Sequence, residues 1–235
     1  MKRAGLSLAA LLLSACMLLG ALYGILTLQM YDLSFYEKEY EREGQAQRIG
    51  MSEEDLMKTT GVLLDYMQEK REDLVVQVTV RGQEREFFNE QEKLHMVDVN
   101  AILRGFDLFS LLAGCLFCAA LFLFLWRARS GRLEFICASL WRSGALLLLL
   151  FGALGAWAAL DFTSFWTAFH KIFFRNDLWL MDPSVSLMIH LFPEKFFADF
   201  VSEFLKKAAL CVGLPLLGCF GLWLAARRKR RSGQN

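Results

Sequence analysis

Four long apolar runs constrain the fold of this chain of 235 residues more than any other feature: they lie near residues 4–28, 106–126, 143–160 and 208–226. A helix crosses the hydrocarbon core of a bilayer, about 30 Å thick, with about 20 mainly apolar residues that rise about 1.5 Å each. Hydrophobic residues make up 55% of the chain and are gathered in these runs, which is not typical of a soluble domain. We therefore predict a membrane α-helical protein, a bundle of four transmembrane helices.

The basic residues that flank these runs predict the orientation of the bundle. Short loops on the cytoplasmic side of a membrane protein carry an excess of Lys and Arg. With four spans, three basic groups fall on the same side of the membrane, which predicts that both termini are cytoplasmic. The groups are Lys2 and Arg3; Arg127, Arg129, Arg132 and Arg142; and Arg227, Arg228, Lys229, Arg230 and Arg231.

The predicted organisation follows from these spans. It comprises a first transmembrane helix (1–28), an extracytoplasmic α+β segment (29–105), a second transmembrane helix (106–126), a cytoplasmic loop (127–142), a third transmembrane helix (143–160), an extracytoplasmic aromatic segment (161–207), a fourth transmembrane helix (208–226) and a basic cytoplasmic tail (227–235).

Two cysteine patterns leave alternatives open. The sequence from Leu13 to Cys16 has the form of a lipobox, but apolar residues continue to Leu28, so we expect an uncleaved first span. Cys115 and Cys118 have the spacing of a redox pair, but they lie well inside a span, where small packing residues are the simpler interpretation.

The first outer segment has the patterns of a small folded α+β cap. Ser52 followed by Asp55 has the spacing of a capping box before a helix that ends near Lys70. Alternating valines predict a strand over 74–81, followed by a turn at Gly82-Gln83 and a second strand over 85–89. Helical patterning then resumes and is expected to run without a break into the second span.

The second outer segment is short and dense in aromatic residues, with Lys, Arg and Asp between them. This composition suits the headgroup layer of a membrane. Pro183 and Pro193 divide the segment into short pieces, so we predict interfacial helices and loops.

The three histidines, His95, His170 and His190, all fall in the outer segments. A neutral imidazole can take a proton from a nucleophile near pH 7, and Asp98, three residues after His95 on a helix, could orient it. Hydrogen-bonded interfacial histidines and a zinc site built from His95, His170 and a carboxylate are the alternatives. No Gly-x-Ser-x-Gly elbow or glycine-rich phosphate loop is present, and a net charge of +1 gives no reason to expect nucleic acid.

A series of short motifs gives the chain a family resemblance over nearly its whole length. The chain resembles a family of bacterial four-span integral membrane proteins that includes the lipoprotein intramolecular transacylase. The motifs are Tyr36 to Tyr40, Gly50-Met51-Ser52-Glu53-Glu54-Asp55-Leu56, Leu64-Asp65-Tyr66, His95-Met96-x-Asp98-Val99, Phe169-His170-x-x-Phe173-Phe174, Asn176-Asp177-x-Trp179 and Phe192-Pro193-Glu194-x-Phe196-Phe197.

The resemblance implies an acyltransferase of the bacterial plasma membrane with an extracytoplasmic active site and no cofactor or metal. Its partners would be membrane lipids and, as substrate, lipoproteins that carry a diacylglyceryl group. The enzyme would move the sn-2 acyl chain to the amine of the N-terminal cysteine and leave a lyso-form lipoprotein. By motif, His95 and His170 would be catalytic, and the supporting residues would be Asp98, Asn176, Asp177 and Trp179; His190 belongs to none of the motifs.

Two other functions remain as alternatives. A non-enzymatic membrane sensor or partner subunit would use the first outer segment as its binding module and would tolerate changes at both histidines. A metal-dependent membrane hydrolase would contain zinc and be inhibited by chelators.

Overall fold

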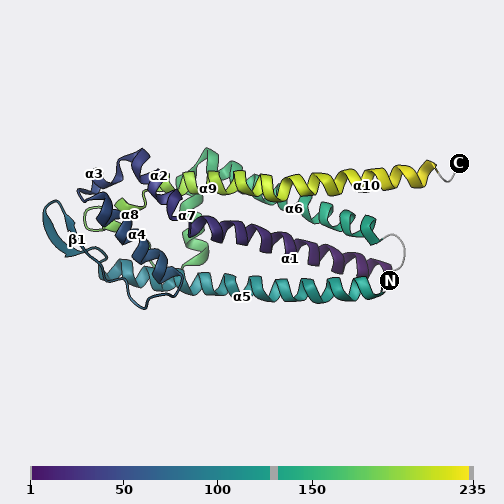
Figure 1. The fold of residues 1–235 in the computed structure, drawn as a ribbon, viewed down its shortest axis with the longest axis horizontal. Helices are drawn as coiled ribbons and strands as arrows, with labels where there is room; N and C mark the ends of the chain where they lie inside the picture. The colour runs from purple at the N-terminus through teal and green to yellow at the C-terminus, as the bar shows by residue number, and fades with distance from the viewer. Residues whose placement is uncertain (1, 128–131, 233–235) are drawn as a thin grey trace. The chain divides into compact units, whose positions relative to one another are not determined.

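A computed structural model describes residues 2–127 and 132–232, and it divides the chain into two compact units (Figure 1). Unit 1 comprises Met1–Thr27, Asp107–Trp157 and Ser202–Asn235, and unit 2 comprises Leu28–Phe106 and Ala158–Val201. Part of the predicted cytoplasmic loop, residues 128–131, and the end of the predicted tail, residues 233–235, lie outside the described residues.

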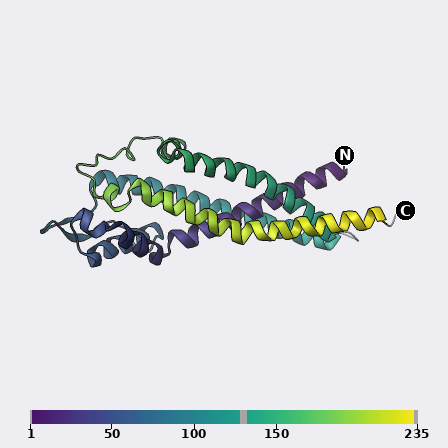
Figure 2. The ribbon, with the colours of Figure 1, turned by 90° about the horizontal axis from the view of Figure 1, so that it is seen from above.

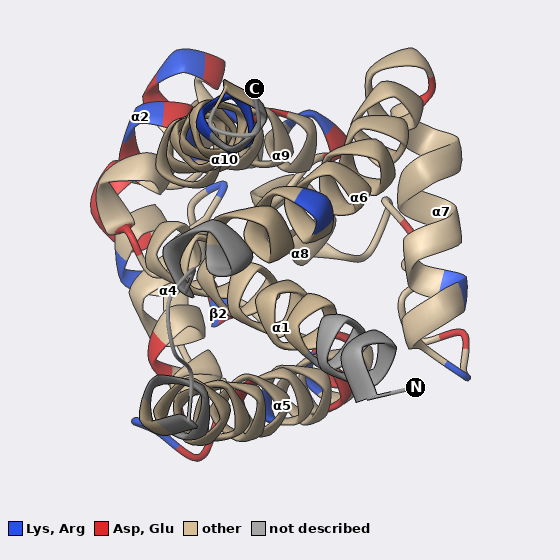
Figure 3. Ribbon diagram, turned by 90° about the vertical axis from the view of Figure 1, so that its right-hand side faces the viewer, with Lys and Arg blue, Asp and Glu red and all other residues tan. Residues whose placement is uncertain are grey.

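Unit 1 is made of long apolar helices. They are α1 (Lys2–Met30), the apolar part of α5 (Glu90–Arg127), α6 (Arg132–Leu160) and α10 (Leu214–Ser232), which follows a short π-helical turn, η1 (Ala209–Gly213). In Figure 3 these helices carry few charged residues over most of their length, and the blue basic residues of α10 lie near its C-terminal end. Among the described residues, four helical stretches are long and apolar enough to cross a membrane: Ala10–Met30, Glu90–Phe122, Cys137–Leu160 and Glu194–Lys229. The prediction of a helical membrane protein with four such helices is confirmed.

Small residues let the helices of unit 1 approach closely. A Cβ atom on Gly144 would lie 2.5 Å from the Leu216 side chain, so α6 and α10 meet at a glycine. One turn away, Trp141 stacks on Phe220 with ring centroids 4.2 Å apart. The Ser143 hydroxyl donates to the Leu11 carbonyl at 2.7 Å and joins α6 to α1.

Unit 2 holds the remaining elements around a hydrophobic core. They are α2 (Leu33–Glu43), α3 (Gln45–Ile49), α4 (Glu53–Met67), β1 (Gln77–Val80), β2 (Gln83–Glu86), the first part of α5, α7 (Phe162–Phe173), α8 (Leu187–Leu191) and the first half of α9 (Glu194–Ala208). The helices α2 to α4 and the hairpin gather in one group in both ribbon views (Figures 1 and 2). Tyr36, Leu56, Val78, Phe87 and Leu191 are among the buried core residues.

Side-chain caps fix where the helices of unit 2 begin. The Ser52 hydroxyl accepts from the Asp55 N–H at 3.0 Å, so the predicted cap of α4 is present. Asp161 caps α7 by accepting from the Ser164 N–H at 3.0 Å. At α5, the Asn89 side chain accepts from the Glu92 N–H at 3.0 Å and the Glu92 carboxylate accepts from the Asn89 N–H at 2.7 Å, which is a reciprocal capping box.

The hairpin is present, but its turn lies one residue earlier than predicted. Val80 pairs with Gln83, so the two turn residues are Arg81 and Gly82, with φ angles of 51° and 79°. Such a turn needs two positive φ values and matches the twist of the flanking strands. Arg81 accepts this conformation because its N–H donates to the Gly50 carbonyl at 2.6 Å, a tertiary contact that the local pattern does not reveal.

Helix α5 belongs to both units and is longer than a membrane requires. Its 38 residues extend about 57 Å. The apolar stretch begins at Phe106, whereas residues 90–105 include Glu90, Glu92, Lys93 and Asp98. This polar first part carries His95, and α5 continues from it into the apolar stretch without a break, as predicted.

Candidate functional site

Unit 2 brings two histidines from distant segments of the chain together. His95 is on the polar part of α5, and His170 is in the last turn of α7. Their ring centroids are 6.3 Å apart and the ring planes differ by 25°, so the two imidazoles face each other. The side chains are almost completely buried, with 6% and 8% of their surface exposed.

Aromatic rings enclose the pair. Phe174 contacts both histidines, with ring centroids 4.9 Å from His95 and 5.5 Å from His170. Trp179 stacks on His170 at 4.9 Å, and Trp166 meets its edge at 4.7 Å. This enclosure keeps water from much of both imidazoles.

The tautomer of His170 is fixed by its own helix. Its Nδ1 lies 2.8 Å from the Trp166 carbonyl oxygen, one turn earlier in α7. A carbonyl oxygen only accepts, so Nδ1 carries the proton and the lone pair of a neutral ring is on Nε2. Burial lowers the pKa of His170, and the bond to Trp166 offsets part of this effect. In the described part of the chain no hydrogen bond occupies Nε2, which is therefore available as a base.

His95 is held neutral more strongly. Burial, followed by repulsion from His170, lowers its pKa to about 4, although the negative charge of Asp98 acts in the opposite direction. Its Nδ1 is buried and has no hydrogen-bond partner among the described residues. A buried acceptor without a partner costs less than a buried N–H donor without one. This difference favours the proton on Nε2, where His95 can donate.

We expect an NMR titration of His95 in detergent micelles to give a midpoint near pH 4, compared with about 6.5 in the unfolded chain. The neutral ring is favoured by the fold, so the unfolded state binds more protons between these pH values. The free energy of unfolding should therefore fall as the pH drops from about 6.5 to about 4, by about 3 kcal/mol in total. A midpoint at or above 6.5 would contradict the buried, neutral state of His95.

Asp98 and Asn176 form a direct contact beside the histidines. The Asn176 side-chain amide donates to Asp98 Oδ2 at 2.8 Å, and its carbonyl accepts from the Leu178 N–H at 3.1 Å. From the sequence we expected Asp98 to orient His95, but among the described residues Asp98 is bonded to Asn176 instead. Asp98 thus acts on His95 through its charge and, with Asn176, ties the segment after α7 to α5.

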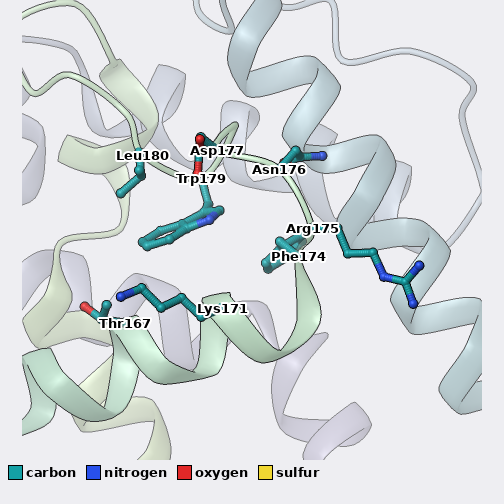
Figure 4. A pocket seen from close by; sticks show the side chains of 8 residues that line it. All are labelled: Thr167, Lys171, Phe174, Arg175, Asn176, Asp177, Trp179 and Leu180. Atoms are coloured by element: carbon teal, nitrogen blue, oxygen red, sulfur yellow. The ribbon is translucent and has the colours of Figure 1, made fainter.

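A pocket of about 370 Å³ lies next to the pair (Figure 4). Thr167 and Lys171 of α7 face Trp179 and Leu180 across the opening. The lining residues are Thr167, Lys171, Phe174, Arg175, Asn176, Asp177, Trp179 and Leu180. Neither histidine is among them, but Phe174 and Trp179 belong to the pocket wall and also contact His170. A ligand in this pocket would therefore lie one ring away from the imidazole.

The structure places the six residues named from the sequence in one region of unit 2. His95, His170, Asp98 and Asn176 make the contacts described above, and Asp177 and Trp179 line the pocket. His190 lies apart from them: it is exposed, and its Nε2 donates to the Pro183 carbonyl at 2.8 Å. In residues 2–127 and 132–232 no group of three His, Cys, Asp or Glu side chains has the arrangement of a metal site.

Three contributors to the site were not predicted from the sequence. The Trp166 carbonyl fixes the His170 tautomer, and only the i−4 spacing on an expected helix could have suggested it. Glu92 anchors the segment before α8, and its capping-box spacing with Asn89 was a usable signal. Lys171 lines the pocket but is one of several cations in an aromatic segment, so the sequence did not distinguish it.

The four long apolar helices define the class: this is an integral membrane protein, and it holds a buried pair of histidines. Comparison with protein-family models gives a match to the lipoprotein intramolecular transacylase Lit over residues 11–197. Because the match spans well over half of the chain and includes both histidines, this chain belongs to the Lit family, a family of lipoprotein intramolecular transacylases.

Solved structures agree on the fold. The in meso structure of the membrane-integral lipoprotein intramolecular transacylase Lit from Bacillus cereus superposes with a TM-score of 0.70 at 19% identity, covering 96% of this chain and 97% of that one. Structures of the same Bacillus cereus protein with one histidine changed to alanine or to arginine give TM-scores of 0.69 and 0.66 at 18% identity. They cover 98% and 99% of this chain and 98% and 96% of theirs. A sequence search among curated proteins gives no match.

Proposed function

We propose that this chain moves the sn-2 acyl chain of a diacylglyceryl lipoprotein from the glycerol oxygen to the amine of the N-terminal cysteine. The observation that supports this reaction best is the facing pair His95 and His170, both buried and neutral. An O-to-N acyl shift requires a base and an N–H donor for an oxyanion, and the tautomers of the pair supply one of each.

The roles follow from the ring nitrogens. The lone pair on His170 Nε2 takes a proton from the amine as the nitrogen attacks the ester carbonyl. The Nε2–H of His95 donates to the oxyanion of the tetrahedral intermediate. When the intermediate collapses, the bond from carbon to the glycerol oxygen breaks, and the His170 imidazolium returns its proton to that oxygen. The product is an amide and a free hydroxyl, and both histidines are neutral again.

The difference in pKa between the two rings supports this assignment. A base works best when its pKa is close to the working pH, and His95, at about 4, is the poorer proton acceptor. A neutral His95 is still a full N–H donor.

The energetics need no cofactor. An amide is more stable than an ester, so the transfer is downhill and the enzyme has only to position the groups and stabilise charge. Water would attack the same ester and give hydrolysis. The rings of Phe174, Trp166 and Trp179, which enclose the imidazoles, are the groups we assign to excluding it.

The basic flanks of the apolar helices support the proposed location. We place both termini in the cytoplasm of a bacterial cell and the histidine pair on the outer face of the plasma membrane. Diacylglyceryl lipoproteins would be the substrate, with membrane lipids around the apolar helices.

The reaction can be tested by mass spectrometry of lipoprotein N-terminal peptides from a bacterial host that leaves the cysteine amine free. Cells that express this chain should yield peptides with an acylated amine and one acyl chain fewer on glycerol. Cells that express the His170→Ala variant at equal membrane abundance should yield the unshifted peptides. Identical peptides from both strains would overturn the proposed function.

Trp179 should matter to catalysis more than to folding. Trp179→Ala removes the ring that stacks on His170 and opens its face to water, so we expect kcat to fall about tenfold. Trp179→Phe keeps a stacking ring and should recover most of the rate. Equal rates for the alanine variant and the wild type would show that the stack does not hold the imidazole.

A further inference from the structure

The pocket beside the histidines has polar and charged side chains next to apolar ones. Five of its eight lining residues are polar or charged, namely Thr167, Lys171, Arg175, Asn176 and Asp177. Burying these charged side chains under an acyl chain would be unfavourable. The charged part of the lining suits a polar part of the substrate.

Lys171 is the basic group best placed to act on a ligand. Figure 4 shows its side chain directed along α7 toward Thr167, on the side of the pocket opposite Trp179. It is exposed, and no carboxylate in the described part of the chain forms an ion pair with it. Arg175 and Asp177 also line the pocket, so the three charges sum to one positive charge (two cations against one anion).

The position of the pocket limits which polar part of the substrate can reach it. Phe174 and Trp179 separate it from His170, where the cysteine amine reacts. An extended polypeptide covers about 3.3–3.6 Å per residue, so a few residues after the cysteine are enough to enter the pocket. The polypeptide necessarily leaves the reacting cysteine, whereas a phospholipid headgroup has no reason to be beside the amine.

We propose that this pocket binds the first residues of the lipoprotein polypeptide after the modified cysteine, and that Lys171 makes the enzyme prefer acidic side chains at those positions. The inference rests on the proposed transacylase function and specifies its substrate. Thr167 offers a hydroxyl within the same wall for peptide groups. Lys171 makes acidic side chains of the peptide favourable and basic ones unfavourable, because its flexible ammonium interacts as a positive point charge.

The test uses purified full-length enzyme and three synthetic diacylglyceryl lipopeptides that differ only at the two positions after cysteine, with Glu-Glu, Ser-Ser or Lys-Lys. We expect kcat/KM to be about tenfold higher for the acidic than for the basic peptide, which is about 1.4 kcal/mol. The ratio should shrink at high salt, because ions screen an exposed pair.

Three variants test whether the charge of Lys171 causes the preference for the acidic peptide. Lys171→Met should reduce the acidic-to-basic ratio to near one, and Lys171→Glu should invert it. Lys38→Glu is the matched control, because Lys38 is an exposed lysine of α2 outside the pocket, and it should keep the wild-type ratio.

The outcomes are distinguishable. Acyl transfer at equal rates on all three peptides would overturn the inference and leave the transacylase function intact. The same rates are measured with and without added phosphatidylglycerol. If the lipid changes the rate of the wild type but not of Lys171→Glu, while the peptide ratio is the same in both, the pocket binds a lipid headgroup and the inference is overturned. Absence of acyl transfer on every peptide would overturn the proposed function and, with it, the inference.

Discussion

His170→Ala should lower kcat by a factor of about 10² to 10⁴, the range that a positioned general base contributes. His95→Ala should cause a comparable loss because the oxyanion then lacks its donor, which elsewhere costs about 10² to 10³ in kcat. The natural control is His190→Ala. This histidine is exposed and bonded to the Pro183 carbonyl, away from the pair, so its loss should change kcat by less than about twofold.

Glutamine substitutions distinguish the two roles. Glutamine carries an N–H donor at about the reach of imidazole Nε2, but it does not accept a proton near neutral pH. His95→Gln should therefore keep more activity than His95→Ala, whereas His170→Gln should be no better than His170→Ala. The opposite pattern in kcat would mean that the two histidines have exchanged roles.

The second large effect concerns stability. Glu92 is fully buried, and its carboxylate accepts three hydrogen bonds, from the Ser186 hydroxyl at 2.6 Å, the Met188 N–H at 2.9 Å and the Asn89 N–H at 2.7 Å. Glu92→Ala leaves these donors without an acceptor and removes half of the capping box. Hydrogen bonds to a charged group contribute about 1.5–3 kcal/mol each, so we expect a loss of at least about 3 kcal/mol in the free energy of unfolding.

This effect is measurable as thermal unfolding in detergent. For a chain of this size the loss corresponds to a Tm lower by about 10 °C. Glu90→Ala is the matched control: Glu90 begins the same helix, its side chain is 86% exposed, and it forms a surface ion pair with Lys93. If both variants unfold at the same temperature, Glu92 does not have the structural role assigned to it.

Glu92 also affects the geometry of the histidine site. It lies one helical turn before His95 on α5, and its partners Ser186 and Met188 precede or begin α8. The carboxylate therefore fixes the segment between α7 and α9 against the helix that carries His95. We expect Glu92→Ala to lower activity as well, with an effect that grows as the temperature approaches its Tm.

The sequence was informative wherever one physical rule acts locally. The apolar runs identified the long helices because a bilayer requires about 20 apolar residues in one stretch. The Ser52 cap and the unbroken passage of α5 into its apolar part were predicted because capping and helical periodicity depend on near neighbours. The family motifs selected His95 and His170, which are 75 residues apart in the chain, and the structure places them face to face.

The parts that the sequence did not reveal depend on tertiary contacts. The hairpin turn is displaced to Arg81 because a distant carbonyl, that of Gly50, bonds to its N–H. Asp98 was expected to contact His95 on the basis of helical spacing, but Asn176, 78 residues away, takes its hydrogen bond. The depressed pKa of His95 likewise comes from burial by Phe174 and repulsion by His170, neither of which is a neighbour in sequence.

The most direct test of the central claim uses purified protein and a synthetic lipopeptide whose sn-1 and sn-2 acyl chains differ in length. Tandem mass spectrometry then identifies which chain is attached to the cysteine nitrogen. We predict transfer of the sn-2 chain alone, on the same molecule, with free fatty acid only as a minor product and with no transfer by His170→Ala. Release of the sn-2 chain as free fatty acid without amide formation would contradict the account and indicate a hydrolase.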